Sequence, residues 1–157
     1  MWSRSGTEAW SEAATAWGVK HEGNCVCVPA VDFDNDGDLD LLLINFYSNV
    51  LLYRNNTNDE RWLRVKAVGT TSNPDGIGAK VKLFAVRGER QQLIGFREIQ
   101  SGAGYCRSSP LEAHFGLGST AADSYRVEIF FPATIKTFIK EAVQGLAELA
   151  CGCCGLG

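Results

Sequence analysis

A chain of 157 residues has room for one or two small domains, and 45% apolar with 21% charged residues is an ordinary globular composition. Lys and Arg number 15 against 18 Asp and Glu, a net charge of −3, so no basic surface for binding nucleic acid is expected. No apolar run reaches the roughly eighteen residues of a membrane span, so no transmembrane segment is expected either.

The N-terminal stretch "MWSRSGTEAWSEAATAWGVK" lacks the apolar segment of a signal peptide. Its apolar residues fall at helical spacing, which predicts a short helix that covers the sheet following it. These residues are Ala9, Trp10, Ala13, Ala14 and Trp17.

The next element is an acidic loop, "VDFDNDGDLDLLL", in which aspartates alternate with other residues and a leucine run comes directly after. The aspartates are Asp32, Asp34, Asp36, Asp38 and Asp40. Carboxylates a few ångströms apart repel one another by about 1 kcal/mol per pair even at the dielectric of water. A counter-ion is therefore expected. Ca²⁺ suits the pattern, because it takes oxygen ligands from a flexible loop whose alternate side chains point inward.

On this interpretation each aspartate has a position in a calcium loop. Asp32, Asp34 and Asp36 supply carboxylates at positions one, three and five, and Gly37 permits the sharp turn at position six. Asp38 offers its backbone carbonyl, and Asp40 closes the shell with a carboxylate. Mg²⁺ is less suitable, since it demands a stricter octahedron and keeps its waters.

An EF-hand opens with the same aspartate spacing but ends differently. It needs a bidentate Glu at position twelve and a helix on each side, whereas this loop has Leu43 there. The segments "LDLLLIN" and "NVLLYRNN" instead predict two strands joined by a tight connection. The calcium loop is thus expected between strands.

The segment "PAVDFDNDGDLDLLLINFYSNVLLYRNN" resembles one FG-GAP/VCBS repeat, the calcium-binding blade unit of integrin-like β-propellers. The pieces "RWLRVKAVGTTSNPDGIGAKVKLF", "REIQSGAGYCRSSPLEAHFGLGS" and "YRVEIFFP" resemble, in order, the ASPIC/UnbV domain of the cartilage acidic protein-like family. In that family the segment equivalent to "EAWSEAATAWGV" is similar to the start of a blade, in conflict with the predicted helix. One blade cannot bury its faces alone, so residues 24–57 are expected to expose an apolar side unless they pack on the second domain.

Three later segments alternate apolar and polar residues, which is typical of antiparallel sheets with one face in water. The predicted inward residues are Leu63, Val65 and Ala67, then Ala79, Val81, Leu83 and Ala85, and finally Tyr125, Val127, Ile129 and Phe131. The fold class predicted is mainly β: one propeller-blade-like repeat (1–58), a small antiparallel β-sandwich (59–134) and a short helical, Cys-rich tail (135–157). The tail helix rests on a stripe of Ile135, Phe138, Ile139, Val143, Leu146 and Leu149.

Six cysteines occur, but neighbours as close as Cys25 and Cys27 rarely bridge each other, and no disulfide is assigned. The "CVC" and "CGCC" spacings fit a zinc site poorly. Cys106 with His114 is the sole nucleophile and base pairing, and no third orienting group is evident. No catalytic residue is therefore predicted, and His114 is expected to hold a turn.

The resemblance implies a calcium-binding, non-catalytic extracellular interaction or adhesion module, secreted or at the cell surface or in the periplasm. Its partner would be a protein or carbohydrate surface. The alternative is the accessory domain of a larger exported hydrolase, because such propellers also occur attached to hydrolases. Since the family is largely exported and no export signal is seen, the chain is expected to be a fragment.

Overall fold

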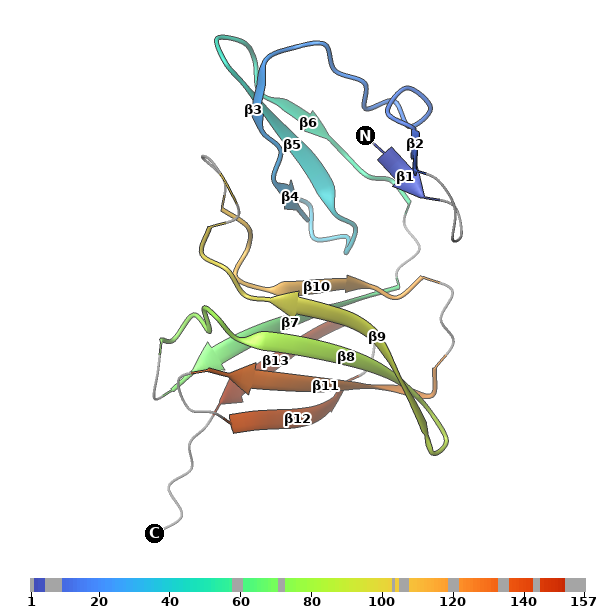
Figure 1. The fold of residues 1–157 in the computed structure, drawn as a ribbon, viewed down its shortest axis with the longest axis vertical. Coiled ribbons are helices and arrows are strands. Elements are labelled where there is room, and N and C mark those ends of the chain that lie inside the picture. Colours follow the sequence, from blue (N-terminus) through green and yellow to red (C-terminus); the bar gives the residue numbers. More distant parts are fainter. Residues whose placement is uncertain are drawn as a thin grey trace.

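The computed structural model describes residues 2–4, 10–57, 61–70, 73–102, 104, 108–118, 122–132, 136–142 and 145–151. Its regular elements are all β-strands, which confirms the mainly β class. They form two groups, which lie one above the other in Figure 1: the repeat region (residues 10–57, with the strand of residues 2–4 paired to it) and the sandwich (residues 61–151).

The N-terminal segment does not form the predicted helix. Strands β1 (Trp2–Arg4) and β2 (Trp10–Glu12) pair antiparallel, and one helical turn comes next, in which Trp17 N donates to Ala13 O. Gly18 then ends the turn: at a φ of 69° its N–H bonds to Thr15 O while Val19 N bonds to Ala14 O. This is the Schellman arrangement, in which a left-handed glycine terminates a helix. Of the residues with helical spacing, Trp10 thus lies in strand β2, and Ala13, Ala14 and Trp17 lie in the single helical turn.

The repeat region is built around one central strand. Its strands are β3 (Cys25–Cys27), β4 (Ala30–Val31), β5 (Asp40–Asn45) and β6 (Leu51–Tyr53). Strand β5 pairs antiparallel with β3 and β4 along one edge and with β6 along the other. Leu41, for example, is paired with Ala30 of β4 on one side and with Tyr53 of β6 on the other. The predicted pair of strands joined by a tight connection is confirmed as β5 and β6. The acidic loop, residues 32–39, joins β4 to β5.

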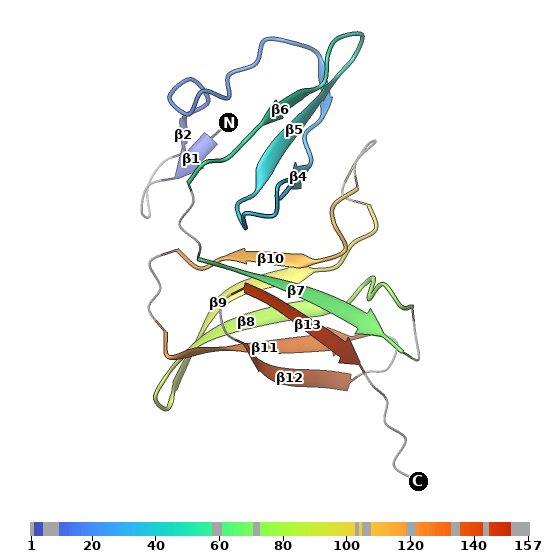
Figure 2. The same cartoon turned by 180° about the vertical axis from the view of Figure 1, so that it is seen from behind.

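The sandwich consists of two sheets (Figures 1 and 2). One sheet has the order β10 (Ala113–Gly116), β7 (Trp62–Gly69), β13 (Gly145–Cys151). The other has the order β12 (Lys136–Ala142), β11 (Ser124–Phe131), β8 (Lys80–Arg87), β9 (Arg90–Glu98). All these pairs are antiparallel except β13 with β7, which run parallel.

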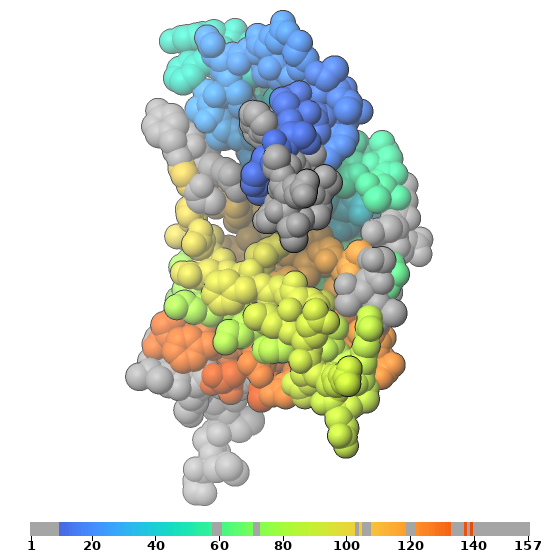
Figure 3. Space-filling model, turned by 45° about the vertical axis from the view of Figure 1, so that its right-hand side comes forward, coloured from blue at the N-terminus to red at the C-terminus, as the bar shows by residue number. Residues whose placement is uncertain are grey.

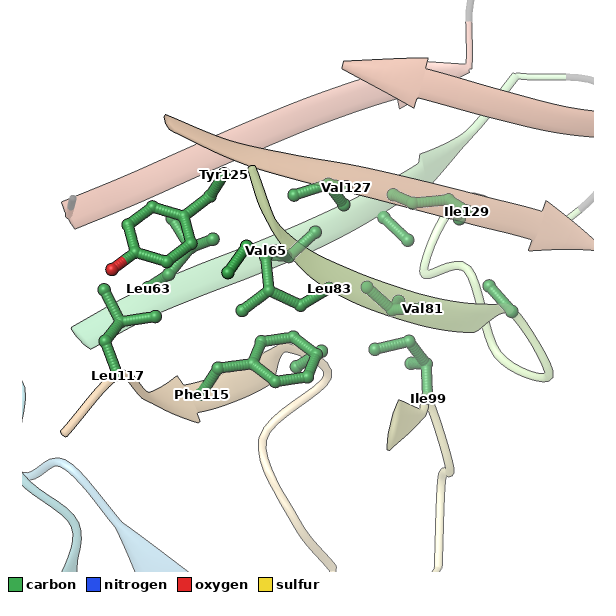
Figure 4. Close-up of a cluster of buried hydrophobic side chains, with 14 of the residues drawn as sticks. Leu63, Val65, Val81, Leu83, Ile99, Phe115, Leu117, Tyr125, Val127 and Ile129 are labelled. Atoms are coloured by element: carbon green, nitrogen blue, oxygen red, sulfur yellow. The ribbon is translucent and has the colours of Figure 1, made fainter. Parts of the chain in front are cut away.

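The core of the protein lies between these two sheets (Figure 4). All the residues predicted to point inward on β7, β8 and β11 are buried, and so is Ala79 just before β8, so these predictions are confirmed. Phe115 and Leu117, in and after β10, and Ile99, after β9, complete the core. Two of these three lie in or beside the strand that faces the repeat region.

The prediction of a helical tail is wrong for the described residues. Strand β12 continues one sheet beyond β11, with Phe131 opposite Lys136, and β13 continues the other beyond β7, with Leu63 opposite Gly145. An unpaired sheet edge offers a row of backbone donors and acceptors, and satisfying it outweighs a weak local preference for helix. Ile135 and Val143 of the predicted stripe lie outside the described residues.

The repeat region exposes apolar side chains, as expected for a lone blade. Phe46, Val50 and Leu52 are about half exposed and Tyr47 is fully exposed, all in or near the connection from β5 to β6. Phe33 and Leu39 of the acidic loop are also exposed. Nowhere in the described part of the chain is there a helix of the length and apolarity required to cross a membrane.

Candidate metal centre

The acidic loop turns twice through left-handed backbone conformations between β4 and β5. Asn35 has a φ of 60° and Gly37 a φ of 95°. Asn tolerates the left-handed region better than most residues, and Gly enters it without steric cost. The expectation that Gly37 permits a sharp turn is therefore confirmed. Both residues lie between aspartates, so their backbone conformations set the directions in which the neighbouring aspartate side chains leave the loop.

The loop brings three of the predicted carboxylates together. Asp32, Asp34 and Asp40 each offer an oxygen that lies within 4.8 Å of the others. Asp36 is outside this group, although its side chain is only 20% exposed. No side-chain oxygen of Asp38 belongs to the group, and a ligand role of its backbone carbonyl stays a prediction.

Backbone N–H groups fix several of these carboxylates. Asp32 Oδ2 accepts from Gly37 N at 3.1 Å, and Asp36 Oδ1 accepts from Asp38 N at 2.9 Å. Asp40 is fully buried, with Oδ2 accepting from Phe33 N at 3.1 Å and Oδ1 from Asn55 N at 2.7 Å. These bonds orient the side chains before any ligand arrives.

Other carboxylate oxygens are buried without a hydrogen bond from the protein. They are Asp32 Oδ1, both oxygens of Asp34, and Asp36 Oδ2, with Asp34 Oδ2 lying 2.8 Å from Arg54 Nε in an ion pair. A buried charged oxygen without a partner is unfavourable by roughly 1–3 kcal/mol or more. The Asp32 side chain is only 3% exposed, so water replaces the missing partner poorly. The donor set, hard carboxylate oxygens at alternate positions, fits a divalent cation such as Ca²⁺.

Two arginines beside the loop were not anticipated from the sequence. Arg54, just after β6, reaches Asp34 at 2.8 Å and Asp36 at 3.7 Å, and Arg64 of β7 reaches Asp32 at 3.4 Å. Arg54 lies in the "LYRN" piece directly after a strand that pairs with β5, which places it near the loop. Arg64 lies between the inward residues Leu63 and Val65, on the side of β7 for which the alternation predicts contact with water, and no local signal indicates that this side meets the loop.

The sandwich contacts the loop directly. His114 Nε2 lies 2.7 Å from Gly37 O, which confirms that this histidine holds a turn, and the Trp62 ring stacks on it at 6.4 Å between centroids. Beside these contacts a cleft of about 610 Å³ is lined from both regions, by residues that include Asp32, Arg64 and His114. Figure 3 shows the surface indented between the blue N-terminal region and the yellow side of the sandwich.

Two of the cysteines, Cys25 and Cys27, lie in the described part of the repeat region, at the two ends of β3. Cys25 is exposed and Cys27 is buried, and the Sγ of Cys25 lies 3.4 Å from Cys27 O. Cys106, the candidate nucleophile beside His114, lies outside the described residues, as do Cys153 and Cys154.

Fold and loop together define a β-repeat with an acidic loop, followed by a β-sandwich. Residues 2–82 match the model described as FG-GAP-like repeat, and residues 69–147 match the model described as ASPIC and UnbV. Each match covers about half of the chain. The chain therefore belongs to the family that joins an FG-GAP-like repeat to an ASPIC and UnbV domain, as its motifs predicted.

Two curated relatives carry the same name. "Cartilage acidic protein 1" of Homo sapiens and that of Mus musculus are each 38% identical to this chain over 119 residues. The aligned part is 73% of this chain and 17% of each relative, so the chain spans about a sixth of the length of the curated relatives it matches. No solved structure matches the chain.

Proposed function

We propose that the acidic loop binds one Ca²⁺ and that the chain is a calcium-stabilised interaction module. The side chains of Asp32, Asp34, Asp36 and Asp40 would supply carboxylate oxygens and Asp38 its backbone carbonyl. The observation that carries this proposal is the set of buried carboxylate oxygens without a hydrogen bond, on three successive aspartates of the loop. A cation of about 2.4 Å contact distance and flexible coordination would be a partner for Asp32 Oδ1 and Asp34 Oδ1. It would take the place of Arg54 at Asp34 Oδ2 and Asp36 Oδ2.

The ion's role in this proposal is structural. When bound, Ca²⁺ neutralises the carboxylates and ties the loop to β5, which lies at the centre of the repeat sheet. The chain's own residues hold the ligands: Gly37 N orients Asp32, and Phe33 N and Asn55 N orient Asp40. The expected affinity is that of extracellular calcium modules, with Kd on the order of 10⁻⁴ to 10⁻³ M.

We propose further that the module is not an enzyme. His114, the candidate base, donates from Nε2 to the Gly37 carbonyl and stacks on Trp62, which supports a role in holding the turn. The proposed ion is surrounded mainly by protein oxygens, which does not favour an activated water.

The proposed setting is extracellular: secreted, at the cell surface or periplasmic. Membership of the FG-GAP family and the similarity to cartilage acidic protein support an interaction or adhesion role on a protein or carbohydrate surface. Exposed aromatic and aliphatic side chains on the repeat region offer contact area for such a partner. We place the division between repeat and sandwich at residue 58. The role of accessory domain to an exported hydrolase remains the alternative, and no contact among the described residues favours it.

Titration calorimetry of the full chain tests the calcium site. Calcium is expected to bind with one-to-one stoichiometry, and Asp34→Asn to weaken binding at least tenfold because it removes a charged ligand. Glu89→Gln is a matched control: this exposed acid lies in the turn between β8 and β9, so its loss should leave binding unchanged. If calcium produces no binding heat, or if Asp34→Asn binds as well as the parent, the loop is not the site.

A further inference from the structure

The acidic loop has one side turned toward the sandwich, where β7 and β10 meet it (Figure 1). His114, in β10, lies 77 positions from Gly37, yet its Nε2 is 2.7 Å from the Gly37 carbonyl oxygen. A carbonyl oxygen only accepts, so Nε2 must carry the hydrogen and donate it. The contact is thus a hydrogen bond from the second domain into the turn of the metal loop.

With this bond, both polar groups of one peptide unit are hydrogen-bonded. The Gly37–Asp38 peptide is held at its carbonyl by His114 and at its N–H by Asp36 Oδ1, at 2.9 Å. The next carbonyl along the chain is that of Asp38, the proposed backbone ligand. Fixing the plane of one peptide restricts the direction of the carbonyl that comes after it. His114 therefore acts on a ligand that it does not touch.

Trp62 presses the same turn from β7. A Cβ built on Gly37 would lie 1.7 Å from Trp62 Nε1, so the indole occupies the space that any side chain there would need. Trp62 in turn stacks nearly parallel to His114, with an angle of 14° between the two rings. The glycine at position six thus serves two purposes, the left-handed turn and the close approach of the sandwich.

Arg64 makes the third contact, to the first ligand of the loop. Its Nη1 lies 3.4 Å from Asp32 Oδ2, the oxygen that already accepts from Gly37 N, and Oδ1 has no hydrogen bond. Glu112 Oε2 lies 3.5 Å from Arg64 Nε, and the guanidinium sits 5.2 Å from the centre of the Trp62 ring. These neighbours hold Arg64 in place. Asp32 is therefore held through Oδ2, while its Oδ1 remains without a hydrogen bond.

We infer that the sandwich completes the metal centre, with His114 as a positioning residue, so that calcium affinity depends on the second domain and calcium in turn fixes the two domains together. This inference rests on the proposed calcium site. A loop that is ordered before the ion arrives loses less conformational entropy on binding, which raises its affinity. Linkage is reciprocal: whatever factor the His114 contact adds to calcium affinity, calcium adds to the stability of that contact.

The test compares the two histidines of the chain by calcium titration of the full protein. His114→Ala should weaken calcium binding about three- to tenfold, the worth of one net hydrogen bond. His114→Gln, whose side-chain amide can still donate to Gly37 O, should recover most of that loss. His21→Ala is the matched control, because His21 also forms one bond through Nε2, to Asn45 Oδ1 at 2.8 Å, at the end of β5 far from the loop. It should bind calcium within twofold of the parent.

Hydrogen exchange on the unmodified chain gives a second readout that needs no variant to fold. Calcium should increase the protection of amides in β10, in the domain that supplies no ligand, as well as in the loop. If calcium binds but β10 is unaffected and His114→Ala binds as the parent does, the inference is overturned while the calcium site stands. If the parent chain binds no calcium, the site and the inference both fall.

Discussion

Asp40 Oδ1 accepts a hydrogen bond from the backbone N–H of Asn55 at 2.7 Å, which links the first residue of β5 to the segment leaving β6. Its other oxygen accepts from Phe33 N in the acidic loop, and the whole residue is buried. One carboxylate thus joins the loop, the central strand and the chain that leads to the sandwich. Both bonds are made to protein atoms alone.

The first prediction is that Asp40→Ala destabilises the protein even in chelator. Two backbone N–H groups lose their acceptor, and each donor left unpaired costs about 1–3 kcal/mol, so a loss of about 2–6 kcal/mol is expected. Asp40→Asn keeps one acceptor oxygen and should fall between. Chemical denaturation in excess chelator measures the free energy of unfolding.

Asp123→Ala is the control for that experiment. Its Oδ2 also accepts from a backbone N–H, that of Gly88 at 2.9 Å, but on the exposed surface. Water can replace this partner, so the loss should be below about 1 kcal/mol. Equal stability of the Asp40→Ala and parent chains in chelator would show that Asp40 serves only the ion.

Much of the fold can be predicted from local sequence patterns, because those patterns coincide with the pleat of the strands. Val65 and Val81 are buried as their alternation predicts. Successive side chains of a strand point to opposite faces, so when one face of the sheet is in water the other residues must point into the core. The aspartate spacing likewise located the acidic loop, because its chemistry is contained in nine residues.

Contacts between distant segments were beyond prediction from patterns. Strand β13 pairs in parallel with β7 over residues that also suit a helix, and only the presence of an open sheet edge decides between the two. The approach of His114 to Gly37 joins positions 77 apart. Nothing near either residue in the sequence indicates that the water-facing side of β10 meets the turn of the loop.

The second prediction concerns stability with and without calcium. An ion that binds only the folded state stabilises it by about 2.7 kcal/mol at a free concentration a hundredfold above its Kd. Thermal melts in calcium should therefore show a higher Tm than melts in chelator, and Mg²⁺ at the same concentration should raise Tm less. Equal melting temperatures would remove the structural role, and calcium-dependent hydrolysis of esters, glycosides or phosphates would favour the enzyme alternative.

A third prediction separates backbone strain at Gly37 from the approach of Trp62. Gly37→Ala places a methyl group in the indole as well as a side chain in the left-handed region, and should cost at least about 3 kcal/mol. Gly88→Ala is the matched control, because Gly88 also has a positive φ, 54°, but open space around it. It should cost only about 1–2 kcal/mol.

The comparison of the two glycine variants is made by urea denaturation. If Gly37→Ala and Gly88→Ala lower the free energy of unfolding by the same amount, Trp62 does not restrict the turn. If instead Trp62→Ala relieves most of the excess cost of Gly37→Ala in a double-mutant cycle, the indole is the obstacle.

The fourth prediction is that the repeat region makes the isolated chain associate or bind a hydrophobic dye. Phe46 is 51% and Val50 57% exposed, beside the fully exposed Tyr47, and a lone blade has no neighbour to cover them. Phe46→Ser with Val50→Ser should reduce dye fluorescence and the mass seen by sedimentation. Leu93→Ser is the control, since Leu93 is 51% exposed but lies on β9 of the sandwich. A monomeric, dye-silent parent would contradict the prediction.

The last prediction is that Arg54 competes with the ion. Its guanidinium is half exposed and pairs with Asp34 at 2.8 Å and Asp36 at 3.7 Å, two of the proposed ligands. Arg54→Met removes a positive charge whose repulsion of a nearby cation is about 1 kcal/mol or more per unit charge even in water, so calcium should bind several-fold more tightly. In chelator the same variant should be less stable than the parent, because the carboxylates then lose the counter-charge that Arg54 supplies. Arg90→Met, at an exposed arginine beginning β9, should change neither quantity. Calorimetry and denaturation on the same samples measure both effects, and weaker calcium binding by Arg54→Met would show that Arg54 shapes the ligand set instead of competing with the ion.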